Sequence, residues 1–366
     1  MQQTVSIEQV NRDGMIIIIN GDRLQVSFDR FPLFRDMTLD EIYDVDFFDD
    51  EILEWEKADV HIYIDTFYHP EKYVQRFGVR PFASDPGPAG DLRELLGSDA
   101  WRGTEAGIPV VLGKDAAGKV KIADLSKAPH MLVAGSEKNA FFKTLTASLI
   151  YRFPPEELKL IPIGPEPAEL KVCASLPHLL TPPIDSPAEA VSSLRRTFEE
   201  LEHRYRILAE ARAKNLPDFN RLMQKPERAA DENGNPVPRK LPRLIVIVNE
   251  LADVMESETK DEAEKLICRI AQKGRAAGIH LVIGVRTPSK EVISGIIKAN
   301  LPTVIAFKVS TVEESCEILD CPGAEQLGEG DMLFRPPCGE MERIHAAAAS
   351  DADIGKIADF IASQNR

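Results

Sequence analysis

Apolar and polar positions divide the chain into segments with two different periods. From about residue 110 onward, short continuous apolar runs alternate with longer stretches whose apolar residues recur every three or four positions. A continuous apolar run predicts a strand buried on both faces, and the three-to-four spacing predicts an amphipathic helix. Buried strands are expected at 131–134, 158–163, 244–248, 280–285 and 304–309, and helices at 139–152, 188–213, 261–274 and 290–299. This alternation indicates an α/β fold with a mostly parallel central sheet that helices cover on both faces.

The beginning of the chain follows a different pattern, and residues 1–78 are expected to form a separate small α+β domain. Strand-like runs at Val5–Val10 and Met15–Ile19 flank a turn sequence that contains Asn11, Asp13 and Gly14. A third run with alternating polarity follows at Arg23–Asp29. These runs predict a hairpin or a small meander.

Two further segments complete the division into domains. Residues 36–56 are acidic with interspersed apolar and aromatic residues. We interpret them as a solvated face over a small core, with an acidic and aromatic partner-binding surface as the alternative. Residues 79–91 are rich in Pro and Gly and predict a linker to a large domain at 92–366.

Composition narrows the classes of protein that fit. The chain has 366 residues, of which 43% are hydrophobic and 28% charged, and it lacks both a long apolar run and a basic-then-apolar start. These features favour a globular, cytoplasmic protein without a membrane partner. Five scattered cysteines suit reduced thiols, and the lone C-x4-C pair of Cys316 and Cys321 favours helix packing over zinc, so no metal site is expected.

Charge bears on whether nucleic acid is a partner. The net charge is −15, whereas affinity for a phosphate backbone depends on clustered Lys and Arg. DNA is therefore a disfavoured partner. Arg269, Lys273 and Arg275 recur on one predicted helix, and we interpret them as an ordinary solvated face, with a small basic patch as the alternative.

Several segments of the large domain resemble the motor domain of the FtsK/SpoIIIE family of DNA translocases. They occur in the family's order and include "ADLSKAPHMLVAG" (123–135), "LEHRYRIL" (201–208), "AQKGRAAGIHLVIG" (271–284), "SGIIKANLPTVIAF" (294–307) and "GDML" (330–333). The resemblance extends over about residues 91–347. It implies a RecA-like P-loop NTPase fold, ATP and Mg²⁺ as cofactors, assembly as hexameric rings and movement along DNA.

The segment that should bind phosphate departs from the family's pattern. A phosphate loop needs several glycines whose N–H groups surround the phosphates, a Lys for the β/γ charge and a Ser/Thr hydroxyl for Mg²⁺. The resemblance aligns Lys138 with the family's Lys and Asn139 with its Ser, but only Ser136 and Glu137 separate Gly135 from Lys138, where the family has five residues. We expect a tight turn from strand to helix that Ser136 can cap, with the Glu137 carboxylate where the γ-phosphate charge belongs. An alternative register uses Lys143 and Thr144, but it has no preceding glycine and shortens the helix.

Three further positions depart from the family's residues in the same functional region. "RLIVIVNELADVM" (243–255) resembles the Walker B strand, and it has Asn249 and Glu250 where the family has Asp-Glu. An amide carries no negative charge for the metal, although Glu250 alone retains the chemistry of a general base. Arg286 stands where the family has a Gln that senses the γ-phosphate, and Cys316 where it offers an Arg to a neighbouring subunit's nucleotide.

These departures lead to three hypotheses about function. The first is a catalytically degenerate FtsK-like protein, a pseudo-ATPase that acts as an interaction or regulatory subunit. Its partner would be an active FtsK-like motor or copies of itself, and neither ATP nor Mg²⁺ is expected as a cofactor. Residues 135–139 would then be a vestigial phosphate loop, and Asn249, Glu250, Arg286 and Cys316 vestigial catalytic positions. The alternatives are an ATP-driven translocase of the FtsK/SpoIIIE type, which binds ATP and Mg²⁺, and a stand-alone scaffold protein.

Overall fold

A computed structural model of the chain describes the backbone of three strands within residues 5–27 and most of residues 91–364. Within the second range, residues 165–175, 225–239 and 257 are not described. The chain divides into two compact units, Met1–Arg76 and Phe77–Arg366.

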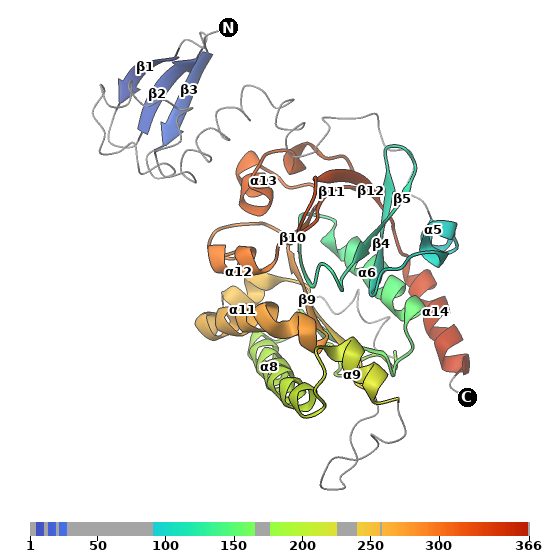
Figure 1. Cartoon of the computed structure of the whole chain (residues 1–366). Coiled ribbons are helices and arrows are strands. Elements are labelled where there is room, and N and C mark those ends of the chain that lie inside the picture. The colour runs from blue at the N-terminus through green and yellow to red at the C-terminus, as the bar shows by residue number, and fades with distance from the viewer. Residues whose placement is uncertain are drawn as a thin grey trace. The chain divides into compact units, whose positions relative to one another are not determined.

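The described part of the first unit is a three-stranded antiparallel sheet (Figure 1). It consists of β1 (Val5–Val10), β2 (Gly14–Ile19) and β3 (Asp22–Ser27), which confirms the three predicted strands. The acidic stretch at 36–56 and the predicted linker, except Asp91, lie outside the described residues. The predicted domain boundaries and the α+β character of the first domain therefore stay predictions.

The second unit is built on a nine-stranded sheet with the order β5-β4-β12-β11-β10-β6-β9-β8-β7. The strands are β4 (Pro109–Asp115), β5 (Val120–Asp124), β6 (His130–Ala134), β7 (Leu158–Ile163), β8 (Arg243–Val248), β9 (Ile279–Val285), β10 (Thr303–Ala306), β11 (Asp331–Arg335) and β12 (Glu342–Ala346). The five strands from β10 to β7 are parallel and form the predicted α/β core. The four strands from β5 to β11 extend it in antiparallel fashion.

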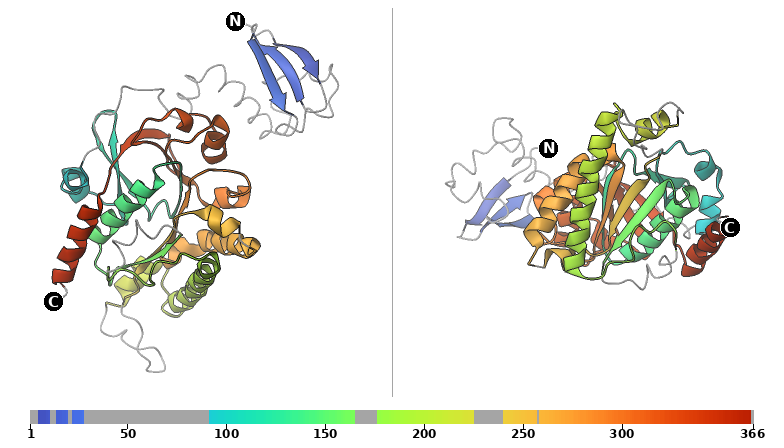
Figure 2. Two further views of the ribbon diagram at one scale, coloured as in Figure 1. Left: turned by 180° about the vertical axis from the view of Figure 1, so that it is seen from behind. Right: turned by 90° about the horizontal axis from the view of Figure 1, so that it is seen from below.

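Helices cover both faces of this sheet, as Figure 2 shows. One face packs on α8 (Pro187–Glu210), α10 (Leu251–Met255), α11 (Lys260–Ala277), α12 (Gly295–Asn300) and α13 (Val312–Leu319). The other packs on α4 (Leu92–Leu96), α5 (Asp99–Arg102), α6 (Lys138–Arg152) and α14 (Asp351–Gln364). The short elements α9 (Leu216–Leu222) and η4 (Ala324–Gln326) complete the set.

Alternating side chains of β6 divide the core between the two faces. Leu132 and Ala134 belong to the α8/α11 side, and Met131 and Val133 to the α6 side. All four are buried, which is why this strand reads as a continuous apolar run.

One predicted helix begins later than its apolar pattern suggested. The helix predicted at 290–299 begins at Gly295, because the Ser294 side chain accepts a hydrogen bond from the Ile297 N–H and caps it. The other three long helices differ from prediction by one to three residues at their ends.

The order β6-β9-β8-β7 brings four strand ends together at one edge of the sheet. Because these strands are parallel, the residues that follow them, Gly135, Arg286, Asn249 and Gly164, lie at the same carboxyl edge. This is the edge where open α/β sheets bind ligands.

Candidate functional site

The turn between β6 and α6 is closed by hydrogen bonds of its own backbone. The Gly135 N–H donates to the Val285 carbonyl at 3.0 Å, and the Ser136 N–H donates to the Lys308 carbonyl at 3.0 Å. Gly135 has φ +99°, and a Cβ there would lie 2.7 Å from the Phe307 carbonyl oxygen and 2.8 Å from that of Lys308. Both amides therefore join the turn to the segments after β9 and β10, and neither is available to an anion.

The start of α6 differs from the expectation that Ser136 caps it. The N-cap residue is Glu137, and no side chain makes a capping hydrogen bond. The Ser136 hydroxyl instead donates to the Lys308 carbonyl at 3.3 Å, because the turn brings it alongside the chain that leaves β10. The expected capping role of Ser136 is therefore wrong.

The Glu137 carboxylate reaches the loop before β11, a contact that sequence reasoning missed. Its Oε2 accepts a hydrogen bond from the Gly330 N–H at 2.9 Å. Burial raises the pKa of Glu137, and the negative charges of Glu329 and Asp331 act in the same direction, while the Gly330 N–H opposes them. The segment "GDML" resembles the family and so pointed to this loop, but no sequence feature indicated that Glu137 contacts it.

A buried carboxylate follows directly in β11. Asp331 is 3% exposed and is held by Arg343 and by His345, whose Nδ1 lies 2.8 Å from Asp331 Oδ1. Both partners come from β12, so this cluster fixes the β11–β12 pair beside Glu137.

Lys138 is buried and bonded within the protein. The residue is 1% exposed, and its Nζ donates to the Asn249 carbonyl at 2.8 Å and to Asn139 Oδ1 at 3.1 Å. The ammonium also lies 3.3 Å from Glu250 Oε2. The structure thus joins the predicted loop residues to the end of β8 through one lysine side chain.

The two residues after β8 complete this contact. Asn249 is 4% exposed, and its N–H donates to the Ile163 carbonyl at 2.7 Å. Glu250 caps α10, where Oε1 accepts from the Ala252 N–H at 3.4 Å. Its Oε2 accepts from the Arg286 N–H at 3.1 Å, so Arg286 contributes its backbone to the site while its side chain is exposed.

The alternative register on Lys143 and Thr144 is wrong. Both residues lie within the second turn of α6, after a helix start at Lys138. Thr144 is fully buried, and its hydroxyl donates to the Ala347 carbonyl at 2.8 Å. A phosphate loop leads directly into its Lys-Ser/Thr pair, whereas helical residues 138–142 stand before Lys143 here.

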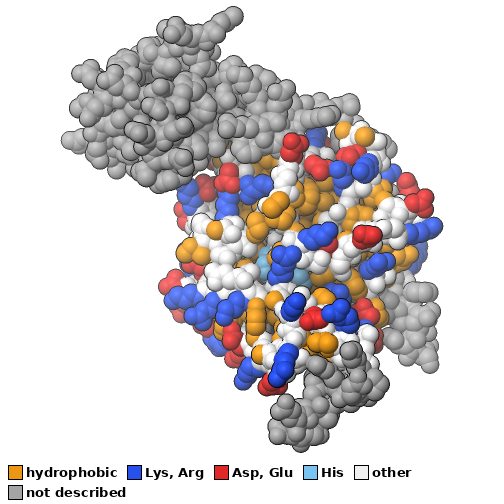
Figure 3. All heavy atoms as spheres, in the orientation of Figure 1, with side chains coloured by type: hydrophobic (Ala, Val, Ile, Leu, Met, Phe, Trp, Pro, Cys, Tyr) orange, Lys and Arg blue, Asp and Glu red, His pale blue; other side chains and the backbone are white. Residues whose placement is uncertain are grey.

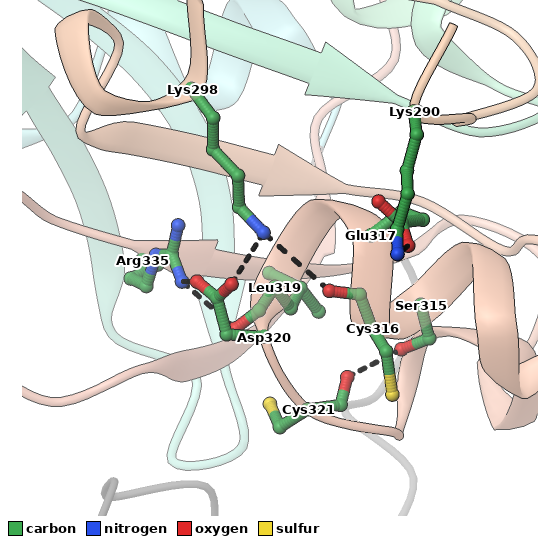
Figure 4. A network of polar contacts seen from close by, with 9 residues as sticks. All are labelled: Lys290, Lys298, Ser315, Cys316, Glu317, Leu319, Asp320, Cys321 and Arg335. Atoms are coloured by element: carbon green, nitrogen blue, oxygen red, sulfur yellow. Dashed lines mark hydrogen bonds and ion pairs between the residues drawn. The ribbon is translucent and has the colours of Figure 1, made fainter. Parts of the chain in front are cut away.

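Cys316 lies on α13. Its carbonyl accepts hydrogen bonds from the Asp320 N–H at 2.9 Å and from Lys298 Nζ at 3.5 Å (Figure 4). Cys316 and Cys321 are thiols rather than a disulfide. Among the residues that the structure describes, no group of three or more His, Cys, Asp and Glu side chains is arranged to hold a metal ion.

The basic residues of α11 are engaged with their neighbours. The Arg269 guanidinium lies 5.5 Å from the centre of the Phe198 ring, and Lys273 Nζ lies 3.5 Å from Glu202. Figure 3 shows basic and acidic side chains intermingled on one face of the molecule. These contacts support the solvated-face interpretation of α11 over a basic patch.

Comparison with known proteins identifies the family. The family model "FtsK/SpoIIIE family" matches residues 91–290. The chain belongs to the FtsK/SpoIIIE family. The resemblance of its motifs is thereby confirmed.

Individual curated relatives of the same family match this chain over most of its second unit. The protein is 41% identical over 278 residues to the DNA translocase FtsK of Helicobacter pylori strain J99, and 42% identical over 286 residues to that of Haemophilus influenzae. The alignments cover 75% and 73% of this chain, but only 32% and 54% of the relatives. The chain thus spans about a third to a half of the length of these two relatives.

Solved structures support the fold. The conjugation coupling protein TcpA of pCW3, solved as a monomer with ATPγS, matches with a TM-score of 0.60 at 24% identity and covers 72% of each chain. The Type VII secretion ATPase EccC of Thermomonospora curvata matches with a TM-score of 0.61 at 20% identity, over 74% of this chain and 35% of the other. The predicted α/β, RecA-like P-loop NTPase fold is confirmed. In the part of the chain that the structure describes, no helix is both long and apolar enough to cross a membrane.

Proposed function

We propose that this protein is a member of the FtsK/SpoIIIE family that does not hydrolyse ATP and acts as an interaction or regulatory subunit. Its partner is a motor of the same family or further copies of the chain. The observation that carries the proposal is the closed turn between β6 and α6.

The turn leaves too little backbone to surround a polyphosphate. Only Ser136 and Glu137 separate Gly135 from Lys138. The N–H groups of Gly135 and Ser136, which belong to the loop, donate to the Val285 and Lys308 carbonyls. A phosphate loop works by pointing consecutive N–H groups at the phosphates, so ATP does not fit these residues.

The groups that would hold Mg²⁺ are also unsuited to it. Asn249 brings a neutral amide where a carboxylate would serve as a hard anionic ligand. Asn139 brings an amide in place of a hydroxyl, and its Oδ1 accepts from Lys138. Glu250 is engaged with Lys138 and with two backbone N–H groups. The retained residues therefore support a structural role for this edge of the sheet.

Calorimetric titration with ATPγS and Mg²⁺ tests the proposal. We expect no binding at micromolar concentrations to the full-length chain. The purified motor domain of a curated FtsK relative serves as the matched positive control. Binding of comparable affinity to both proteins would contradict the proposal.

The partner is tested separately. Light scattering after gel filtration of the chain, alone and mixed with such a motor domain, should show either self-assembly or a mixed complex. A monomer that joins neither would remove the interaction role while leaving the absence of hydrolysis intact.

An ATP-driven DNA translocase is the second candidate. It is favoured by identities of 41–42% to proteins named DNA translocase FtsK, and these relatives support it more directly than they support the first candidate. It requires Mg²⁺-dependent phosphate release that DNA stimulates. The stand-alone scaffold stays a prediction.

One variant separates hydrolysis by this chain from trace contamination. In an active motor, Glu250→Gln removes the acid that orients the attacking water, and phosphate release should fall at least about a hundredfold. Under our proposal the wild type and Glu250→Gln give the same background with and without duplex DNA. A DNA-stimulated rate that Glu250→Gln abolishes in a folded protein would establish the second candidate.

A further inference from the structure

We propose that Cys316 and Cys321 form a reversible redox site at the end of α13. A low-molecular-weight disulfide would convert the two thiols to an intramolecular disulfide, and a small thiol would restore them. This inference does not depend on the ATPase activity or inactivity of the protein.

The way α13 ends brings the two cysteines together. Asp320 has φ +63°, in the left-handed region, and its N–H donates to the Cys316 carbonyl at 2.9 Å. In a helix that ends this way, the second residue beyond the last turn folds back over the residue five positions earlier, and their side chains commonly touch. Cys321 and Cys316 occupy these two positions.

Hydrogen bonds hold Cys321 in this reversed position. The Ser315 hydroxyl donates to the Cys321 carbonyl at 2.9 Å and accepts from the Ala324 N–H at 3.0 Å. Ser315 is fully buried, so residue 321 is fixed beside the neighbour of Cys316. Figure 4 shows both cysteines at the same end of the helix, with the Cys321 sulfur directed away from Cys316, so the pair closes only after the Cys321 side chain rotates.

Ion pairs brace the residue between the two cysteines. Lys298 Nζ lies 2.5 Å from Asp320 Oδ1, and Arg335 Nη1 lies 2.8 Å from Asp320 Oδ2 (Figure 4). Arg335 also donates to the Leu319 carbonyl at 2.8 Å. The backbone of the turn therefore holds its shape while the cysteine side chains rotate and the thiols react.

The environment of Cys321 bears on the order of reaction. Burial raises the pKa of Cys321 to about 12, and the adjacent Cys316 acts in the same direction. The thiolate is the attacking species, so Cys321 is disfavoured as the first attacker, and the proposal assigns the first attack to Cys316.

The reaction is a thiol–disulfide exchange in two steps. The Cys316 thiolate attacks the small disulfide RSSR, forms a mixed disulfide and releases one RS⁻. Cys321 loses its proton to solvent and attacks the Cys316 sulfur, and the second RS⁻ leaves. Two protein thiols are oxidised, and one RSSR is reduced to two RSH.

The test uses the full-length protein in oxidised glutathione, followed by alkylation of remaining thiols and mass spectrometry. Cleavage after Glu317 separates the two cysteines unless a disulfide joins them. We expect the two fragments to stay joined, lighter by two hydrogen atoms, and to separate after reduction.

Variants define which thiols take part. Cys321→Ser should convert the product to a glutathione adduct on Cys316, whereas Cys316→Ser should slow all modification at Cys321. Cys338 is exposed and serves as a matched control that gains only an adduct. Adducts on Cys316 and Cys321 in separate fragments, or pairing of either with another cysteine, would overturn the proposal.

Discussion

At the scale of single residues, the candidate site depends on the contacts of Lys138. Its ammonium is buried, and it is satisfied by the Asn249 carbonyl, Asn139 and the Glu250 carboxylate. A buried charge that loses its partner costs more free energy than the pair contributes when intact. Lys138, which the resemblance aligns with the family's phosphate-binding Lys, therefore joins α6 to the end of β8 in this protein.

The first prediction concerns this ion pair. Glu250→Gln leaves the Lys138 ammonium buried without a counter-charge and should lower the free energy of unfolding by about 2–4 kcal/mol. Lys138→Met should cost less, because Glu250 retains two backbone N–H donors and partial exposure. Urea unfolding of both variants and of the double variant measures the coupling.

A solvent-exposed pair provides the control for this measurement. Lys240 and Glu157 lie 2.7 Å apart with side chains 42% and 33% exposed. Glu157→Gln should change the free energy of unfolding by about 1 kcal/mol or less. Equal effects of Glu157→Gln and Glu250→Gln would contradict the buried role of Lys138.

The second prediction concerns Gly135. Alanine there combines a positive φ with a Cβ closer than 3 Å to two carbonyl oxygens, and should cost about 3 kcal/mol or more in unfolding free energy. Gly118 also has a positive φ, +76°, but its Cβ position is open. Gly118→Ala should therefore cost only about 1 kcal/mol in the same thermal or urea unfolding assay. Similar costs at both positions would mean that the β6–α6 turn relaxes freely.

At the scale of elements, the junction of β6 and β9 carries two buried histidines. The Leu281 N–H donates to His130 Nδ1 at 3.1 Å, which requires a neutral ring that accepts at this nitrogen. Burial lowers the pKa of His130 to about 3, with the nearby His280 acting in the same direction, and burial lowers that of His280 to about 4. The core strands of the site therefore depend on uncharged histidines.

The third prediction is loss of stability in mild acid. In the unfolded chain both histidines bind protons below about pH 6.5, whereas in the folded chain they do not until about pH 4 or lower. The stability that the two neutral histidines contribute should thus be fully present above pH 6.5. It should fall as the pH drops from there towards 4, by at most about 1.4 kcal/mol per pH unit for each histidine.

Urea unfolding between pH 7.5 and 5 measures this slope. His130→Asn keeps an acceptor for Leu281 but cannot titrate, so its slope should be smaller. His203 is exposed on α8, and His203→Asn should leave the slope unchanged. An unchanged slope in His130→Asn would exclude His130 as a source of the acid sensitivity.

At the scale of the whole molecule, the negative charge is unevenly distributed. Residues 1–76 contain 17 acidic and 7 basic residues, a balance of −10, so residues 77–366 account for only −5 of the total of −15. The argument against DNA contact from net charge therefore applies to the first unit more than to the family domain.

The fourth prediction follows from this distribution. At about 150 mM salt, neither the full chain nor residues 77–366 should bind duplex DNA at micromolar concentration, since neither has a net positive charge. At about 50 mM salt, residues 77–366 should bind severalfold more tightly than the full chain, because the repulsive unit is gone. Fluorescence anisotropy with a labelled duplex checks both, and tight, salt-resistant binding by either would favour the translocase.

Much of the fold could be predicted because its signals are local. The continuous apolar runs at β6, β8 and β9 report burial on both faces, and the prediction placed these strands within one residue of their observed ends. The antiparallel part of the sheet was harder to predict from the sequence, since the pairings of β12 with β4 and of β10 with β11 join distant segments. The late start of α12 depends on one serine cap within an otherwise helical pattern.

The sequence by itself determined the order of strands and helices, the family, and the short spacing between Gly135 and Lys138, because periodicity, motifs and spacing are properties of neighbouring residues. Only the tertiary structure decided what the altered positions do. Lys138 meets the carbonyl of a residue 111 positions away, and Glu137 meets an N–H 193 positions away. No local pattern encodes such contacts. The first arises because the parallel strands β6, β9 and β8 end at one edge of the sheet, and the second because the antiparallel strand β11 begins at that edge.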